Sequence, residues 1–73
     1  MLDPYERLAN AIILQAVRDW RGAMVRLRKR PNNRDAQDIV NETERFFHSG
    51  WFGVLTKLDG DTLLEKLKEE YPV

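Results

Sequence analysis

Residues 3–30, DPYERLANAIILQAVRDWRGAMVRLRKR, decide the fold class of this chain. The stretch opens with Asp3, a residue type that accepts hydrogen bonds at helix starts, and Pro4, whose missing N–H costs nothing in a first helical turn. Glu6 adds a negative charge near the positive end of the helix dipole. We therefore predict a long helix that begins at Pro4 and ends at about Arg30.

This long helix is amphipathic, because its apolar residues recur every three or four positions. The apolar face comprises Tyr5, Ala9, Ile12, Ile13, Ala16, Val17, Trp20, Ala23, Met24 and Leu27. The opposite side carries Arg7, Asn10, Arg18, Arg21 and Arg28. Gly22 lies inside the helix, and we interpret it as a weak point, about 1 kcal/mol worse than alanine, in preference to a close helix contact.

A turn and a second helix follow. Pro31-Asn32-Asn33 predicts a chain reversal, because proline restricts the residue before it and asparagine tolerates turn conformations. The second helix is predicted from about Arg34 to His48. Its stripe of Ala36, Ile39, Val40, Thr43, Phe46 and Phe47 is expected to pack against the first helix.

Two shorter helices complete the prediction. Ser49 is a suitable N-cap for a third helix from Trp51 to about Leu58, whose apolar residues nearly surround its axis. Asp59-Gly60-Asp61 predicts a turn and cap for a fourth helix, from about Thr62 to Glu70. The apolar face of that helix comprises Leu63, Leu64, Leu67 and Tyr71.

No segment alternates with the period of a strand, and 73 residues can close only one hydrophobic core. We therefore predict a single all-α domain over residues 1–73. Its architecture is a small antiparallel helical bundle of one long helix, one medium helix and two short helices. A core of this size is marginally stable, so tight packing, self-association or a partner is expected to reinforce it.

The chain has no cysteine, which suits a reducing compartment and excludes disulfides and thiolate metal sites. Met1 to Pro4 lack the basic and apolar regions of a secretion signal. The longest purely apolar run, Ala11 to Leu14, is too short to cross a bilayer. We expect a cytoplasmic protein without a membrane segment.

Nothing in the sequence predicts a catalytic centre, so we expect a protein that is not an enzyme and needs no cofactor or metal. Glu44 and His48 stand four positions apart on one helix face, but two ligands without a third do not hold a metal. We interpret them as a solvated pair. Asp59-Gly60-Asp61 resembles part of a calcium loop but lacks the full ligand pattern.

The aromatic content indicates a protein-binding surface. Trp20, Phe46, Phe47, Trp51, Phe52 and Tyr71 are too many large rings for so small an interior, and we expect Trp51 or Phe52 to lie on an interface. Leu14 and Val25 point in nearly the same direction on the otherwise polar side of the first helix, beside Arg18 and Arg21. The predicted partner-binding residues are therefore Leu14, Arg18, Arg21, Val25, Trp51 and Phe52. Self-association into a homo-oligomer is one form that such binding takes.

Charge suggests a second hypothesis. The net charge is zero, but residues 1–34 carry eight basic and three acidic side chains, and the remainder carries the opposite excess. Arg26, Arg28, Lys29, Arg30 and Arg34 form a basic cluster that could neutralise nucleic-acid phosphates. We favour the interpretation that they complement the helix dipole. The acids Asp59, Asp61, Glu65, Glu69 and Glu70 could imitate a phosphate backbone, although we favour a solvated helix face.

Two stretches carry a resemblance. Residues 6–13, ERLANAII, with 15–21, QAVRDWR, and residues 45–64, RFFHSGWFGVLTKLDGDTLL, resemble small uncharacterised all-helical accessory proteins of phages and conjugative elements of Gram-positive bacteria. The resemblance implies no catalytic residues. It implies a compact protein that acts by stoichiometric binding, including inhibition of host defence enzymes of the anti-CRISPR kind, in the host cytoplasm.

The sequence therefore supports three hypotheses of function. The first is a non-enzymatic phage or mobile-element accessory protein that binds another protein. The alternative is a nucleic-acid-binding regulator that uses the basic cluster. A third is a self-assembling helical protein that holds a small anionic ligand between its subunits.

Overall fold

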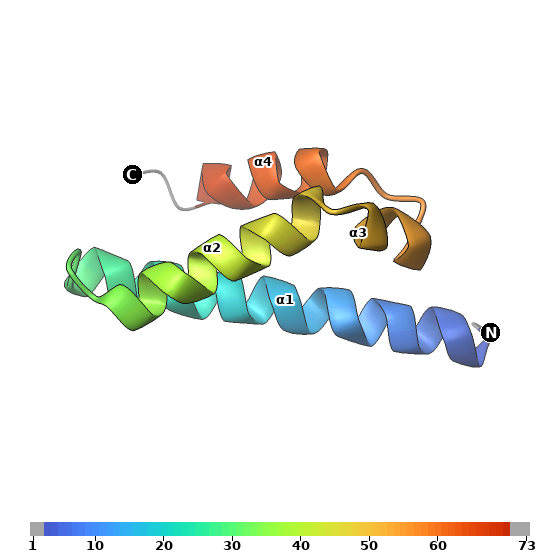
Figure 1. Ribbon diagram of the computed structural model, residues 1–73, viewed down its shortest axis with the longest axis horizontal. Helices are drawn as coiled ribbons and strands as arrows, with labels where there is room; N and C mark the ends of the chain where they lie inside the picture. The colour runs from blue at the N-terminus through green and yellow to red at the C-terminus, as the bar shows by residue number, and fades with distance from the viewer. Residues whose placement is uncertain (1–2, 71–73) are drawn as a thin grey trace.

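The computed structural model describes residues 3–70 and contains four α-helices, with no strand among those residues (Figure 1). The helices are α1 (Pro4–Lys29), α2 (Arg34–His48), α3 (Gly50–Leu55) and α4 (Gly60–Glu70). α2 runs antiparallel to α1, and α4 returns along α2 (Figure 1). The predicted all-α class and the small helical bundle are confirmed. Tyr71, which was expected on the apolar face of the last helix, lies outside the described residues.

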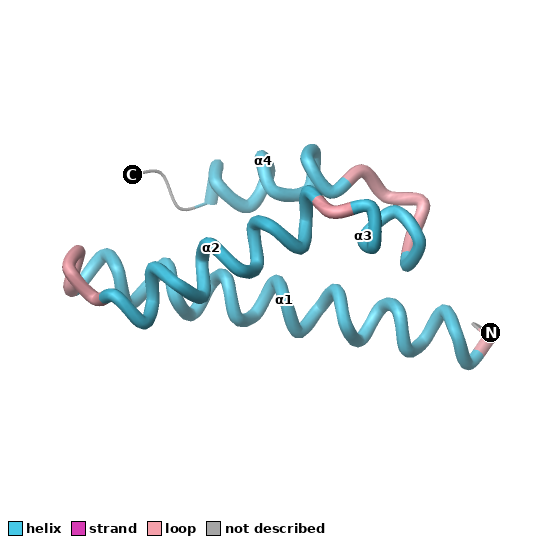
Figure 2. The backbone as a smooth tube through the Cα atoms, in the orientation of Figure 1, coloured by secondary structure: helices cyan, strands magenta, loops and turns pink. Residues whose placement is uncertain are grey.

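Short connections join the helices at residues 30–33, at residue 49 and at residues 56–59 (Figure 2). The fold measures 41 × 20 × 19 Å along its principal axes. The turn between α1 and α2 lies at one end of the long axis, and α3 lies toward the other, beside the N-terminal half of α1 (Figure 1). Within residues 3–70, no helix is both long and apolar enough to cross a membrane.

The first two helices begin and end where local chemistry places their boundaries. The Glu6 backbone N–H donates to the Asp3 carboxylate at 2.9 Å, so the predicted cap of α1 is confirmed. α1 ends at Lys29, and the Arg30 N–H donates to the Arg26 carbonyl at 2.8 Å. α2 spans the predicted residues, and the Asn33 side chain accepts from the Ala36 N–H at 3.1 Å.

The predicted end of the third helix is wrong. The Ser49 hydroxyl accepts from the Phe52 N–H at 3.3 Å, as its role as N-cap predicts, but α3 begins at Gly50 and ends at Leu55. Thr56 is in an extended conformation, with φ −155° and ψ 159°. Its hydroxyl accepts from the Leu58 N–H at 3.2 Å, and this local hydrogen bond competes with continuation of the helix.

The fourth helix begins at Gly60, two residues earlier than predicted. Asp59 supplies the cap, because its carboxylate accepts from the Asp61 N–H at 3.0 Å and from the Thr62 hydroxyl at 2.9 Å. Its carbonyl accepts from the Leu63 N–H at 3.0 Å, which is the first helical hydrogen bond. The Thr62 hydroxyl and then the Asp61 N–H lower the pKa of the Asp59 carboxyl, since both stabilise its ionised form.

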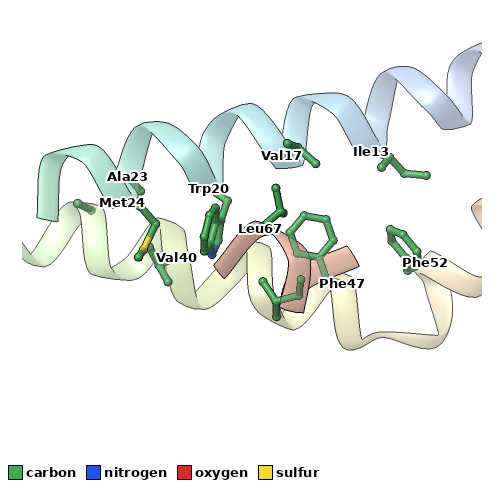
Figure 3. Packing of buried hydrophobic residues seen from close by; sticks show 11 residues of the cluster. Ile13, Val17, Trp20, Ala23, Met24, Val40, Phe47, Phe52 and Leu67 are labelled. Carbon is green, nitrogen blue, oxygen red and sulfur yellow. The ribbon is translucent and has the colours of Figure 1, made fainter. Parts of the chain in front are cut away.

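The core lies where α1, α2, α3 and α4 meet. Its largest fully buried side chains are Trp20, Phe47 and Phe52, and Leu64 and Leu67 reach it from α4 (Figure 3). The Phe52 ring lies 5.6 Å from Phe46 and 5.9 Å from Phe47, both in edge-on arrangements that aromatic rings favour. α3 therefore packs on α2 mainly through Phe52, and Leu55 adds a partly buried contact with the core.

Two glycines differ sharply in their surroundings. A Cβ atom at Gly60 would lie 1.9 Å from the Phe47 carbonyl oxygen and 3.1 Å from Cδ1 of Phe52. Only glycine therefore lets the start of α4 approach the end of α2 this closely. At Gly22, a Cβ atom would meet nothing within 4 Å, so Gly22 does not mark a close helix contact, and its interpretation as a weak point stays a prediction.

Candidate protein-binding surface

Large apolar side chains are exposed at the end of the molecule where the first turns of α1 lie near α3. They are Tyr5 and Leu8 of α1, Trp51 and Val54 of α3, and Leu58 of the following loop, and we call this set the apolar end. Tyr5 is 85% exposed and Trp51 is 58% exposed. Figure 1 shows that α3 and the N-terminal half of α1 occupy the same end of the fold.

A difference in helix length explains part of this exposure. α1 has 26 residues and α2 has 15, so about three turns of α1 extend past its main partner. Tyr5 and Leu8 lie in this extension. The sequence prediction placed Tyr5 on the apolar face of the first helix and did not single out Leu8. It counted Val54 and Leu58 among the apolar residues around the third helix, without placing them on an interface. The unequal lengths of the two predicted helices could have indicated that Tyr5 and Leu8 are exposed.

The two aromatic residues of α3 that were expected at an interface differ in exposure. Trp51 is exposed, as expected of an interface residue, but Phe52 is 1% exposed and belongs to the core. Neighbouring positions on a helix point about 100° apart. In α3 the contacts with Phe46 and Phe47 select Phe52 as the buried residue, and Trp51 is consequently turned toward solvent.

A groove of about 310 Å³ runs between α1 and α2. We call this the α1/α2 groove, and it is lined by Ile12, Gln15, Ala16, Asp19, Glu42, Thr43 and Phe46. The lining contains two carboxylates and no basic side chain. Within residues 3–70, neither Asp19 nor Glu42 forms an ion pair, and Asp19 accepts only from the Gln15 amide, at 2.8 Å.

The α1/α2 groove lies on the side of the helix pair away from α4. Arg21 of α1 pairs with Glu70 of α4 at 3.0 Å, and Lys68 of α4 pairs with Glu44 of α2 at 3.5 Å. Positions two apart on a helix are about 200° apart around its axis. Asp19 and Glu42 therefore face away from the side that α4 covers.

The other predicted partner-binding residues, Leu14, Arg18, Arg21 and Val25, follow one another along one side of α1. Leu14 and Val25 are exposed as expected, but they are separated by about 16 Å along the helix axis at 1.5 Å per residue. Arg18 is exposed, whereas Arg21 is partly covered and bound to Glu70. One function of Arg21 is thus to tie the end of α4 to α1.

The basic cluster of Arg26, Arg28, Lys29, Arg30 and Arg34 lies around the turn between α1 and α2, and we call it the basic end. All five side chains are exposed, and none forms an ion pair within the part of the chain that the structure describes. A hollow at this turn is lined by Arg30, Pro31, Asn32 and Asn33. The basic end and the apolar end are at opposite ends of the long axis (Figure 1).

The histidine and its neighbours are arranged differently from the prediction. His48 pairs through Nδ1 with the Asp61 carboxylate at the start of α4, not with Glu44. The interpretation of Glu44 as a solvated residue is wrong, because it is mostly covered and accepts from Nε1 of Trp20 at 3.1 Å. No three His, Asp or Glu side chains within residues 3–70 are placed to hold a metal ion.

The acidic residues of the last helix are largely engaged within the chain. Asp59 caps α4, Asp61 pairs with His48 and Glu70 pairs with Arg21, while Glu65 and Glu69 are exposed. Three of the five acids that were considered as a phosphate mimic therefore have structural partners.

Comparison with protein-family models, curated proteins and solved structures gave no match to this chain. The resemblance to helical proteins of phages and conjugative elements thus stays a prediction.

Proposed function

We propose that this chain is a non-enzymatic accessory protein that acts by binding another protein stoichiometrically. The observation that carries the proposal is the apolar end, where Tyr5, Leu8, Trp51, Val54 and Leu58 are all more than half exposed. Exposed apolar surface of this kind costs free energy in water, and burying it against a partner recovers that cost. Trp51 is the expected anchor, because tryptophan is enriched among residues that dominate binding energy.

Capture experiments with matched variants test this proposal. The tagged chain is used as bait in lysates, and Leu8→Asp and Trp51→Asp variants are compared with Leu14→Asp, which places the same charge on a different exposed surface of α1. We expect a stoichiometric protein that both apolar-end variants lose and the Leu14 variant retains. Absence of any such protein while the chain is folded, or equal capture by all variants, contradicts the proposal.

The origin of the chain in a phage or conjugative element, and a role as an anti-CRISPR inhibitor, extend this proposal on the strength of the sequence resemblance alone. A plasmid-interference assay in cells with an active CRISPR system tests the extension. An inhibitor restores plasmid transformation when the chain is expressed. Unchanged interference removes this form of the proposal without affecting protein binding as such.

The basic end supports nucleic-acid binding as a second candidate function, because five exposed cations gather there without an ion-pair partner among the described residues. Binding through phosphates must weaken steeply as salt rises. A gel-shift titration with duplex DNA and single-stranded RNA at increasing salt tests this candidate. Arg28→Glu with Arg30→Glu is expected to abolish the shift and to leave protein capture unchanged.

A further inference from the structure

The α1/α2 groove carries an inference about the class of partner, and this inference rests on the proposed function in protein binding. We propose that the groove binds a basic amphipathic helix of the partner protein. Apolar side chains of that helix pack on Ile12, Ala16 and Phe46, and its lysine or arginine side chains pair with Asp19 and Glu42.

The way α4 packs shows what kind of element this helix pair accepts. α4 is an amphipathic helix that inserts Leu64 and Leu67 on one side of α1 and α2. Charged side chains flanking this stripe are paired across the contact, as in Arg21 with Glu70 and Glu44 with Lys68. The opposite side of the same two helices offers the same combination of apolar lining and charged edges, but α4 does not pack on it.

The lining of the groove favours apolar side chains at its centre. Phe46 is partly buried and packs against Phe52, and Ile12 and Ala16 are also partly buried. Thr43 is the polar residue nearest the core, but its hydroxyl already donates within α2, toward the carbonyls of Ile39 at 2.8 Å and Val40 at 3.1 Å. The centre of the groove is therefore a surface that an apolar stripe covers with little desolvation cost.

The charges at the two edges of the groove favour a partner helix with basic flanking side chains. Asp19 on α1 and Glu42 on α2 are acidic, and no basic side chain lines the groove. A helix with acidic flanks would place like charges opposite these two residues, which disfavours binding. A helix with basic flanks instead forms one ion pair at each edge.

The exposed part of α1 sets the length of the partner helix. Tyr5, Leu8, Ile12 and Ala16 lie three or four residues apart, so they form one stripe that continues from the groove to the apolar end. From Tyr5 to Asp19 the stripe is about 21 Å long, which corresponds to about four turns of a bound helix.

A second copy of this chain fits the groove poorly. Leu14 and Val25 of a second copy have Arg18 and Arg21 between them, but Arg21 is already bound to Glu70. The basic end lies around the turn between α1 and α2 and does not form the long helix stripe that the groove accepts. Two copies that meet groove to groove would oppose Asp19 and Glu42 with the same acids. The occupant is therefore a helix of a different protein.

Two synthetic peptides test the proposal. Each is a helix of about four turns with a leucine stripe, flanked by lysines in one peptide and by glutamates in the other. They are titrated into the ¹⁵N-labelled full chain, and amide shifts and affinities are measured. We expect the lysine peptide to shift the amides around Ile12, Ala16 and Phe46 and to bind at least about tenfold more tightly than the glutamate peptide.

Charge-reversal variants provide the control. Asp19→Lys with Glu42→Lys is expected to weaken the lysine peptide at least about tenfold, whereas Glu65→Lys with Glu69→Lys, which changes two exposed acids of α4, leaves it unchanged. If circular dichroism shows that the Asp19→Lys, Glu42→Lys variant is unfolded, the Asp19→Asn, Glu42→Gln variant is used in its place. Equal binding of both peptides, equal effects of the two double variants, or shifts centred on Trp51 and Val54 overturn the groove assignment.

The same variants separate this inference from the proposed function. A partner captured from lysate that tolerates the Asp19 and Glu42 substitutions but is lost with Trp51→Asp overturns the groove assignment and leaves protein binding in place. Loss of the partner with both sets of variants supports the groove assignment and protein binding together. Capture of no partner by the folded chain contradicts protein binding itself, whatever the peptides show.

Discussion

Trp20 and Glu44 are joined across the main helix interface: the indole Nε1 of Trp20 donates to Oε2 of Glu44 at 3.1 Å. Trp20 is 0% exposed, and the other oxygen of Glu44 pairs with Nζ of Lys68 at 3.5 Å. A single carboxylate thus connects α1, α2 and α4. Because the core of so short a chain is marginally stable, such a connection contributes noticeably to its free energy of unfolding.

Glu44→Leu is expected to lower the free energy of unfolding by about 1–3 kcal/mol, because it removes this acceptor of the buried indole together with the partner of Lys68. Glu44→Gln keeps an acceptor oxygen and is expected to cost less. Urea denaturation measures both changes. Glu42→Gln, which alters an exposed acid of the same helix, is the control and should stay within about 0.5 kcal/mol of the wild type. A loss of the same size in this control would contradict the role of Glu44.

Gly60→Ala and Gly22→Ala are expected to change stability in opposite directions. The Gly60 variant forces a Cβ atom against the Phe47 carbonyl, so α4 must move, and a loss of more than about 2 kcal/mol is expected. The Gly22 variant has free space and gains about 1 kcal/mol from the better helix propensity of alanine. Thermal unfolding of both variants measures the contrast, and a neutral Gly60→Ala would show that α4 does not start where the structure places it.

Phe52→Ala and Trp51→Ala test the division of the third helix into a buried and an exposed residue. Removal of the buried Phe52 ring is expected to cost about 3–5 kcal/mol, which can unfold a domain of this size. Removal of Trp51 should change stability little, since its side chain is mainly in solvent. Chemical denaturation measures the two losses, and similar losses would contradict the orientation of α3.

Acidification is expected to weaken the start of α4. The pKa of Asp59 is lowered in the folded state, so its stabilising effect is present above its ordinary value of 3.8 and is lost as the pH falls through the folded value. Asp59→Asn keeps a capping oxygen that does not titrate in this range. The melting temperature of this variant should therefore fall less between pH 7 and pH 3 than that of the wild type. Equal falls would show that Asp59 is not the titrating cap.

The helices could be predicted from the sequence because their starts depend on local chemistry. Asp3 and Ser49 accept hydrogen bonds from backbone groups three residues along, and such contacts need no tertiary structure. The end of α3 was missed because apolar periodicity continues to Leu58, whereas Thr56 adopts an extended conformation and its hydroxyl binds the Leu58 N–H.

The candidate site could be predicted only in part. Trp51 was correctly expected to be exposed, but periodicity could not separate it from Phe52, because the choice depends on contacts with Phe46 and Phe47 of another helix. Asp19 and Glu42 were missed, since they come together only through the packing of α1 on α2. The side of α1 and α2 that stays exposed depends on where α4 packs, which is a property of the whole fold.

The most direct test of binding through the apolar end is ¹⁹F NMR of the chain labelled with fluorotryptophan. Its two tryptophans give two resonances, and a Trp51→Phe variant assigns them without interference from the partner. Addition of the captured partner is expected to shift the Trp51 resonance in a saturable manner and to leave that of buried Trp20 nearly unchanged. Saturable binding that leaves the Trp51 resonance in place would contradict the central claim.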